Sequence, residues 1–217
     1  MRHVFVETNW VVDFAAPSPF RPPDALALLE KARNGELQLH LPSVCLTEAR
    51  SPLSRLYARA TGDAVRQFLK WASKENVIAP SDEHAVREAL DQFQGRISSE
   101  RDSMADRLAA LRQEPNLEIF ALNDAMLERA VDLSMQELNL GPFDSSILAA
   151  ILVRSGELVQ QGESDLAFCE LDKDLQPWDK EGKPKERLTD LYDSVRVWVY
   201  GDFALQYPAK PAEWPRK

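Results

Sequence analysis

The stretch HVFVETN, residues 3–9, decides the fold, because a short apolar run ends there on an acid and two further polar residues. Such a run, His3–Glu7, is typical of a buried strand that meets a loop. A second strand is predicted where Leu37, Leu39 and Leu41 alternate with polar residues. Three more apolar runs predict the strands Leu117–Leu122, Leu166–Leu171 and Val195–Tyr200.

Helical patterns separate these strands. The predicted helices are Asp24–Asn34, a helix that carries Glu48, a long polar helix Ser81–Gln113, a helix that follows Asn123, and Phe143–Arg154. Ser43 and Asn123 are expected to cap two of them, and Pro52 to break or kink the helix of Glu48. The run Val77–Ala79 fits either an extra strand or a turn, and 173–187 is expected to be a surface loop. Alternating strands and helices predict an α/β three-layer sandwich with a central, mostly parallel sheet.

Composition narrows the class of protein. Apolar residues make up 44% of the 217 residues and charged residues 28%, which is typical of a globular protein with its own core. A net charge of -9 argues against a protein that coats DNA, although a local basic face remains compatible with it. Cys45 and Cys169 lie in apolar runs and are expected to be reduced core thiols. With no secretory signal and no apolar run long enough to span a bilayer, we expect a cytoplasmic protein without a membrane partner.

Four acids stand where their side chains could reach the carboxyl edge of the sheet: Glu7, Glu48, Asp144 and Asp172. Sites in open parallel sheets form at that edge. Crowded carboxylates repel one another, and a hard divalent cation relieves the repulsion. An oxygen-only ligand set suits Mg²⁺ or Mn²⁺ better than zinc, and the histidines show no ligand spacing. We therefore expect one metal site built from these four residues.

Each acid also has an ordinary explanation. Glu7 could cap a helix or pair with an arginine, Glu48 could be solvated, and Asp144 could interact only with its helix dipole. Asp172 could simply form a turn. One shared site explains all four together, so we favour it.

Three neighbouring residues are secondary candidates. Asp174 is either an outer metal ligand or a solvated loop residue. Thr8 and Asn9 either orient Glu7 or a metal-bound water through hydrogen bonds, or cap a helix.

The arrangement resembles the PIN-domain nucleases. The matching elements are Glu7-Thr8-Asn9 after the first strand, Glu48 in a helix, Asp144 before ILAAI, and Asp172 in LDKDL, and they cover nearly the whole chain. The resemblance implies a metal-dependent endoribonuclease that acts on RNA and leaves a 5′-phosphate. Because many bacterial members are toxins, it also implies an antitoxin protein as a partner. The oligomeric state, including a homodimer, stays open.

The sequence departs from the family in two ways. The first acid is usually Asp, and the extra methylene of Glu7 moves the carboxylate by roughly 1–1.5 Å, which matters in a positioned site. A catalytically weakened fold that binds RNA or protein is therefore the alternative. The second departure is size: we expect one domain, 1–217, with a helical insertion at about 53–114 and an irregular tail at about 201–217.

Basic and aromatic residues bear on RNA binding. Trp10 adjoins the predicted site and is the tryptophan to consider first for base stacking. A run of cations recurs at helical spacing after Glu48, and it fits either a face that follows phosphates or a solvated face with salt bridges: Arg50, Arg55, Arg59, Arg66 and Lys70. The motifs GxxxxGK[ST], GxGxxG and GxSxG are absent, which argues against P-loop, dinucleotide and serine-hydrolase chemistry.

Overall fold

Five strands form one sheet in the order β3-β2-β1-β4-β5, and every neighbouring pair is parallel. The computed structural model describes residues 1–56, 62–136 and 138–206. The strands are β1 (Arg2–Val6), β2 (Leu37–Pro42), β3 (Leu117–Phe120), β4 (Leu166–Cys169) and β5 (Val197–Tyr200). The predicted α/β class is confirmed, and the sheet is wholly parallel.

One reversal of direction defines the centre of the sheet. From β1 the chain moves to β2 and β3 on one side, whereas from β4 it moves to β5 on the other. The point where the strand order reverses therefore lies between β1 and β4, which pair with Val6 opposite Cys169. Ligands of open parallel sheets bind beyond the carboxyl ends of the strands at such a point.

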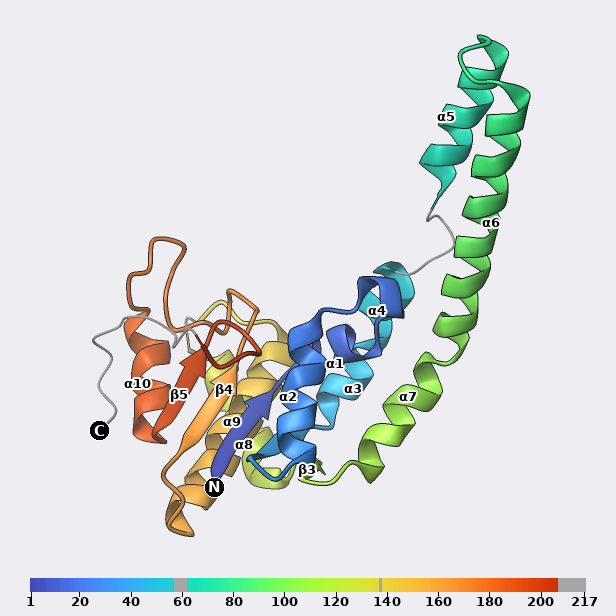
Figure 1. Ribbon diagram of the computed structural model, residues 1–217. Coiled ribbons are helices and arrows are strands. Elements are labelled where there is room, and N and C mark those ends of the chain that lie inside the picture. Colours follow the sequence, from blue (N-terminus) through green and yellow to red (C-terminus); the bar gives the residue numbers. More distant parts are fainter. Residues whose placement is uncertain (57–61, 137, 207–217) are drawn as a thin grey trace.

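Helices cover both faces of the sheet. Figure 1 shows α2 (Pro23–Arg33) in front of the sheet, with α8 (Asp124–Ser134) and α9 (Pro142–Gln160) behind it. The helix α9 buries a long apolar face that runs from Ile147 to Leu158, so it extends past the predicted end at Arg154. The three-layer arrangement is confirmed.

The segment between β2 and β3 is mostly helical. It contains α3 (Val44–Glu48), α4 (Arg50–Leu56), α5 (Asp63–Lys74), α6 (Pro80–Asp102), α7 (Met104–Ala110) and the 3₁₀ turn η2 (Leu111–Gln113). Figure 1 shows α5 and α6 standing out from the body as an antiparallel pair, at the end toward which the strands point.

Several predictions for this segment need correction. The prediction of a single helix Ser81–Gln113 is wrong, because the helix is interrupted at Ser103. The Ser103 hydroxyl donates to the Ser99 carbonyl and so competes with the helical hydrogen bonds. The stretch 77–79 forms no strand: it is an irregular connection with a bend at Ile78 that follows the turn at 75–76, and the Val77 N–H donates to the Ala72 carbonyl in α5.

One of the two predicted helix caps is present and the other is not. The Asn123 side chain accepts a hydrogen bond from the Met126 N–H at 2.9 Å, as expected. Ser43 makes no side-chain cap, and its N–H instead donates to the Phe120 carbonyl across the ends of β2 and β3. The helix that carries Glu48 does break, but at Ala49, between α3 and α4. Pro52 itself lies in the first turn of α4.

Three further elements lie outside the predicted set or boundaries. A helix, α1 (Thr8–Ala15), follows β1 at once, and the 3₁₀ turn η1 (Ser18–Phe20) follows it. The expected surface loop ends earlier than predicted, because α10 (Glu186–Ser194) begins there and buries Leu188 and Tyr192. The expected irregular tail is described as far as residue 206, where it forms bends, and 207–217 lie outside the described residues.

Both cysteines are buried and free, as predicted. Within the described ranges, no helix is both long and apolar enough to cross a membrane.

Candidate active site

A cleft of about 410 Å³ opens at the carboxyl edge of the sheet. All four predicted carboxylates line it: Glu7, Glu48, Asp144 and Asp172. They come from the end of β1, the end of α3, the first turn of α9 and the loop after β4. The structure thus brings together four acids that lie far apart in the sequence.

Glu7 has two roles at once. It is the N-cap of α1, and its Oε2 accepts a hydrogen bond from the Asn9 N–H at 2.6 Å. Only 2% of the residue is exposed, and its other oxygen, Oε1, is buried with no hydrogen-bond partner among the described residues. Burial, helped by the charges of Asp172 and Glu48, raises the pKa of Glu7 to about 8 against the opposing effect of Asn9.

Glu48 is positioned by Thr8. The Thr8 hydroxyl, buried at the start of α1, donates to Oε2 of Glu48 at the end of α3. Thr8 was expected to orient Glu7 or to cap a helix, and the structure instead gives its hydroxyl to Glu48. Asn9 holds Glu7, as expected: its backbone N–H donates to Oε2, and its side-chain hydrogen bond also opposes the rise in the pKa of Glu7.

Asp144 is held by a glycine. The Gly141 N–H donates to Oδ2 of Asp144 at 3.2 Å, and a Cβ at position 141 would lie 2.9 Å from that same oxygen. A side chain at position 141 would therefore push this carboxylate oxygen away from its place. Burial and then the charge of Asp172 raise the pKa of Asp144 above its usual range.

Asp172 is tied to its own loop, since its Oδ1 accepts from the Asp174 N–H at 2.9 Å. Asp174 itself is exposed and does not line the cleft, although its charge contributes to the raised pKa of Asp144. This placement suits an outer position for Asp174 better than a direct one.

Glu170 is a fifth acid that the sequence analysis missed. It follows β4 directly, so the pairing of Val6 with Cys169 places it level with Glu7. Glu170 has no exposed surface, its Oε1 accepts from the Asp172 N–H, and its Oε2 is buried without a partner among the described residues. Burial and the charge of Glu7 raise its pKa well above the usual range.

The residues predicted to bind RNA lie in different places. Trp10 is fully buried, and its Nε1–H donates to the Ala25 carbonyl at 3.1 Å, so it belongs to the core and is wrong as a base-stacking residue. Of the predicted run of cations, Arg55 lines the cleft, whereas Arg66 forms an ion pair with Asp91. Arg59 lies outside the described residues.

The donor set fits a hard divalent cation. Its members are carboxylates, and two of the buried acids, Glu7 and Glu170, keep an oxygen that no described hydrogen-bond donor satisfies. As the side chains lie, no group of three His, Cys, Asp or Glu residues in the described part of the chain is arranged to hold one ion. Direct binding would therefore require the carboxylates to turn toward a common point.

Fold and cleft together define a three-layer parallel α/β protein with an acidic site at the point where the strand order reverses. No family model matches the chain, and it is similar to none of the curated proteins or solved structures with which it was compared.

Proposed function

We propose that this chain is a metal-dependent endoribonuclease that hydrolyses RNA phosphodiester bonds, with Glu7, Glu48, Asp144 and Asp172 as the carboxylates that hold Mg²⁺ or Mn²⁺. The observation that carries the proposal is the convergence of these four acids in one cleft. Asp174 has an outer role in it, and Thr8 and Asn9 are positioning residues.

The way in which the acids are anchored supports a ligand set. The described hydrogen bonds engage only one oxygen of each carboxylate: Oε2 of Glu7 and of Glu48, Oδ2 of Asp144 and Oδ1 of Asp172. The second oxygen of each is left for another partner. Donors that fix one oxygen orient a ligand and preserve its charge.

A bound Mg²⁺ or Mn²⁺ ion would supply Lewis-acid chemistry, by activating water and offsetting charge on phosphate oxygens. The chain's own residues contribute placement and electrostatics. The buried edge of the cleft at Glu7 limits water, and Arg55 provides a positive charge on the wall for a phosphate oxygen. RNA as the substrate follows from the resemblance to PIN-domain nucleases.

The decisive experiment uses Asp144→Asn with purified protein, RNA and manganese. We expect cleavage to fall at least about 100-fold, because losing even a residue that orients a metal ligand costs about 10- to 100-fold. The matched control is Asp124→Asn, which alters an exposed aspartate in the first turn of α8. Full activity of Asp144→Asn would remove this residue from the mechanism.

A second candidate is a PIN-like fold that has lost catalysis and binds RNA or protein. It is favoured by the absence, among the described side chains, of a group already arranged to hold one ion. Calorimetric titration with manganese separates the two candidates. Tight binding supports the enzyme, and no binding at millimolar metal supports the binding module.

A toxin that acts in the cytoplasm and is held by an antitoxin protein is a narrower version of the first proposal, and it rests on the resemblance. Growth arrest upon expression, abolished by Asp172→Ala, is the expected result. Unaffected growth with the parent chain would argue against a toxin without bearing on RNA cleavage in vitro.

A further inference from the structure

A second hollow lies on the opposite flank of the helix that carries Glu48. It has a volume of about 500 Å³ and opens between α3–α4 and α6–α7. Along α3 and α4, Thr47, Ser51 and Arg55 line the acidic cleft, whereas Arg50 and Leu53 line this second hollow. One helical segment therefore separates the two.

The charge of the second hollow is opposite to that of the cleft. Three arginines line it, Arg50, Arg101 and Arg112, and no acidic residue is among its described lining residues. Arg50 and Arg112 make no hydrogen bond or ion pair with another described residue, and Arg101 makes only a 3.7 Å ion pair with the exposed Asp102. Three guanidinium groups with so few partners among the described residues stand out in a chain of net charge -9. We call this hollow the arginine groove.

The floor of the arginine groove is apolar. Leu53 and Met104 are buried there, and Leu46 and Leu108 pack on the core beside them. Guanidinium groups bind phosphate through a planar fork of donors, and an apolar surface accepts the flat face of a base. A single-stranded nucleic acid alternates these two features along its length.

We propose that the arginine groove binds the nucleotides of single-stranded RNA that adjoin the bond in the acidic cleft, so that the strand crosses α4 between the two hollows. This inference rests on the proposed ribonuclease function. A long anion such as RNA is favoured over a small one because positive charge continues from one hollow to the other. Arg55 lies on the cleft side of α4 and Arg50 on the groove side. An α-helix with its side chains is about 10–12 Å across, a span that a short run of nucleotides covers.

The test measures binding apart from cleavage. A fluorescein-labelled single-stranded RNA is titrated in anisotropy with Asp144→Asn protein, alone and combined with Arg50→Gln and Arg112→Gln. We expect roughly tenfold weaker binding from the two added substitutions. We also expect a salt dependence whose slope falls by about 1.4, since each single-strand phosphate contact contributes about 0.7.

The matched control combines Asp144→Asn with Arg129→Gln and Lys180→Gln, which remove two positive charges that do not line the groove. Its affinity should stay close to that of the parent. Circular dichroism melting of both combinations checks that the fold is kept.

Two outcomes would overturn the inference. The first is parent-like RNA affinity in the groove variant. The second is equal displacement of RNA from the parent by a polyglutamate peptide, which would make the groove a general anion site. Cleavage of RNA by the unmodified chain with manganese is measured separately, so the ribonuclease proposal can stand or fall independently.

Discussion

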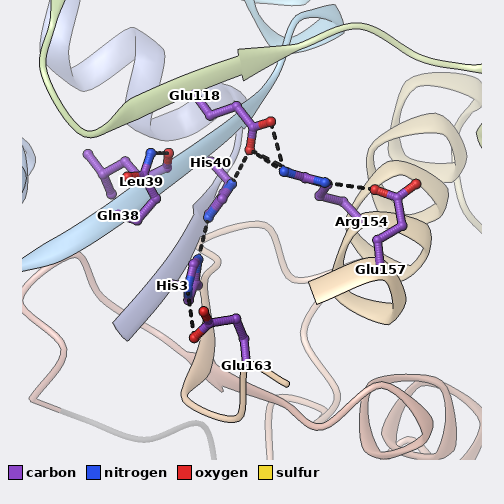
Figure 2. A network of polar contacts seen from close by, with 8 residues as sticks. All are labelled: His3, Gln38, Leu39, His40, Glu118, Arg154, Glu157 and Glu163. Atoms are coloured by element: carbon purple, nitrogen blue, oxygen red, sulfur yellow. Dashed lines mark hydrogen bonds and ion pairs between the residues drawn. The ribbon is translucent and has the colours of Figure 1, made fainter. Parts of the chain in front are cut away.

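Nδ1 of His3 lies 2.9 Å from Nε2 of His40, and this buried contact joins β1 to β2 (Figure 2). The outer nitrogens of the pair face carboxylates: His40 Nδ1 lies 2.6 Å from Glu118, and His3 Nε2 lies 3.2 Å from Glu163. A neutral His40 satisfies both of its contacts, because its Nδ1–H donates to Glu118 and its Nε2 accepts from the Nδ1–H of His3.

Arg154 extends this network to α9. It donates to Glu118 at 2.9 Å and to Glu157 at 2.8 Å, so Glu118 is shared between a histidine and an arginine (Figure 2). Burial lowers the pKa of His40, an effect that the hydrogen bond to Glu118 partly offsets. A proton added at Nε2 of His40 would set its N–H against that of His3.

This network predicts a loss of stability in mild acid. Because the pKa of His40 is lower in the folded state than its unfolded value of 6.5, the unfolded chain binds more protons, and stability falls as pH drops below that value. His40→Gln should cost about 1–3 kcal/mol at pH 7.5 by breaking buried hydrogen bonds. The difference from the parent should shrink toward pH 5.5, as measured by denaturant unfolding.

His84→Gln is the matched control for this prediction, because His84 is exposed on α6. It should follow the parent at every pH. A constant gap between His40→Gln and the parent across this range would contradict the lowered pKa of His40.

The position of these histidines shows what sequence reasoning reaches and what it does not. Their apolar strands were recognised from the patterns around them, and no ligand spacing was found for either. Their contact depends on the register, in which His3 is opposite Gln38 and Phe5 is opposite His40. No pattern within either strand specifies that offset, so the pair could not be predicted.

Most of the candidate site could be predicted because the carboxyl ends of parallel strands lie at one edge of the sheet. Glu7 and Asp172 follow strands whose apolar runs are plain, and Glu48 and Asp144 lie on helices nearby. Glu170 was missed because the apolar pattern of LAFCEL continues to Leu171, which placed Glu170 inside the strand. The strand ends at Cys169, and the Glu170 N–H still bonds to the Tyr200 carbonyl.

The raised pKa of Glu7 predicts that the stability of the metal-free protein falls as pH rises, opposite to the effect of His40. The pKa of Glu7 is raised from 4.5 to about 8, so the folded chain holds the proton more tightly, and this stability is lost as pH rises through that interval. Manganese should restore stability mainly at the alkaline end, by binding the ionised form. Thermal melts between pH 5 and pH 8.5, with metal or with chelator, measure both effects.

Glu7→Gln should flatten the metal-free profile and remove most of the manganese shift. Glu128→Gln, an exposed change on α8, should leave both unchanged. An equal manganese shift in Glu7→Gln and in the parent would exclude Glu7 as a ligand.

A substitution at Thr8 tests whether the orientation of Glu48, rather than its charge, matters for catalysis. Thr8→Val keeps the shape of the side chain but removes the hydroxyl that holds Glu48. We expect kcat on RNA to fall about 10- to 100-fold with little change in KM, because the ligand loses its orientation. Thr8→Ser keeps the hydroxyl and should recover most of the activity. Equal rates for the two variants would show that this hydrogen bond does not matter for catalysis.

Glu170→Gln separates a buried neutral acid from a metal ligand. The side chain does not line the cleft, and its Oε1 already accepts from the Asp172 N–H, so manganese affinity should stay within a few-fold of the parent. Because the pKa of Glu170 is raised well above its usual range, the parent loses stability as pH rises and this group ionises. The variant, which cannot ionise, should therefore be the more stable protein at pH 9 and close to the parent at pH 5. If manganese binding is lost together with the acid, Glu170 is a ligand, and the proposed set of four must be extended to include it.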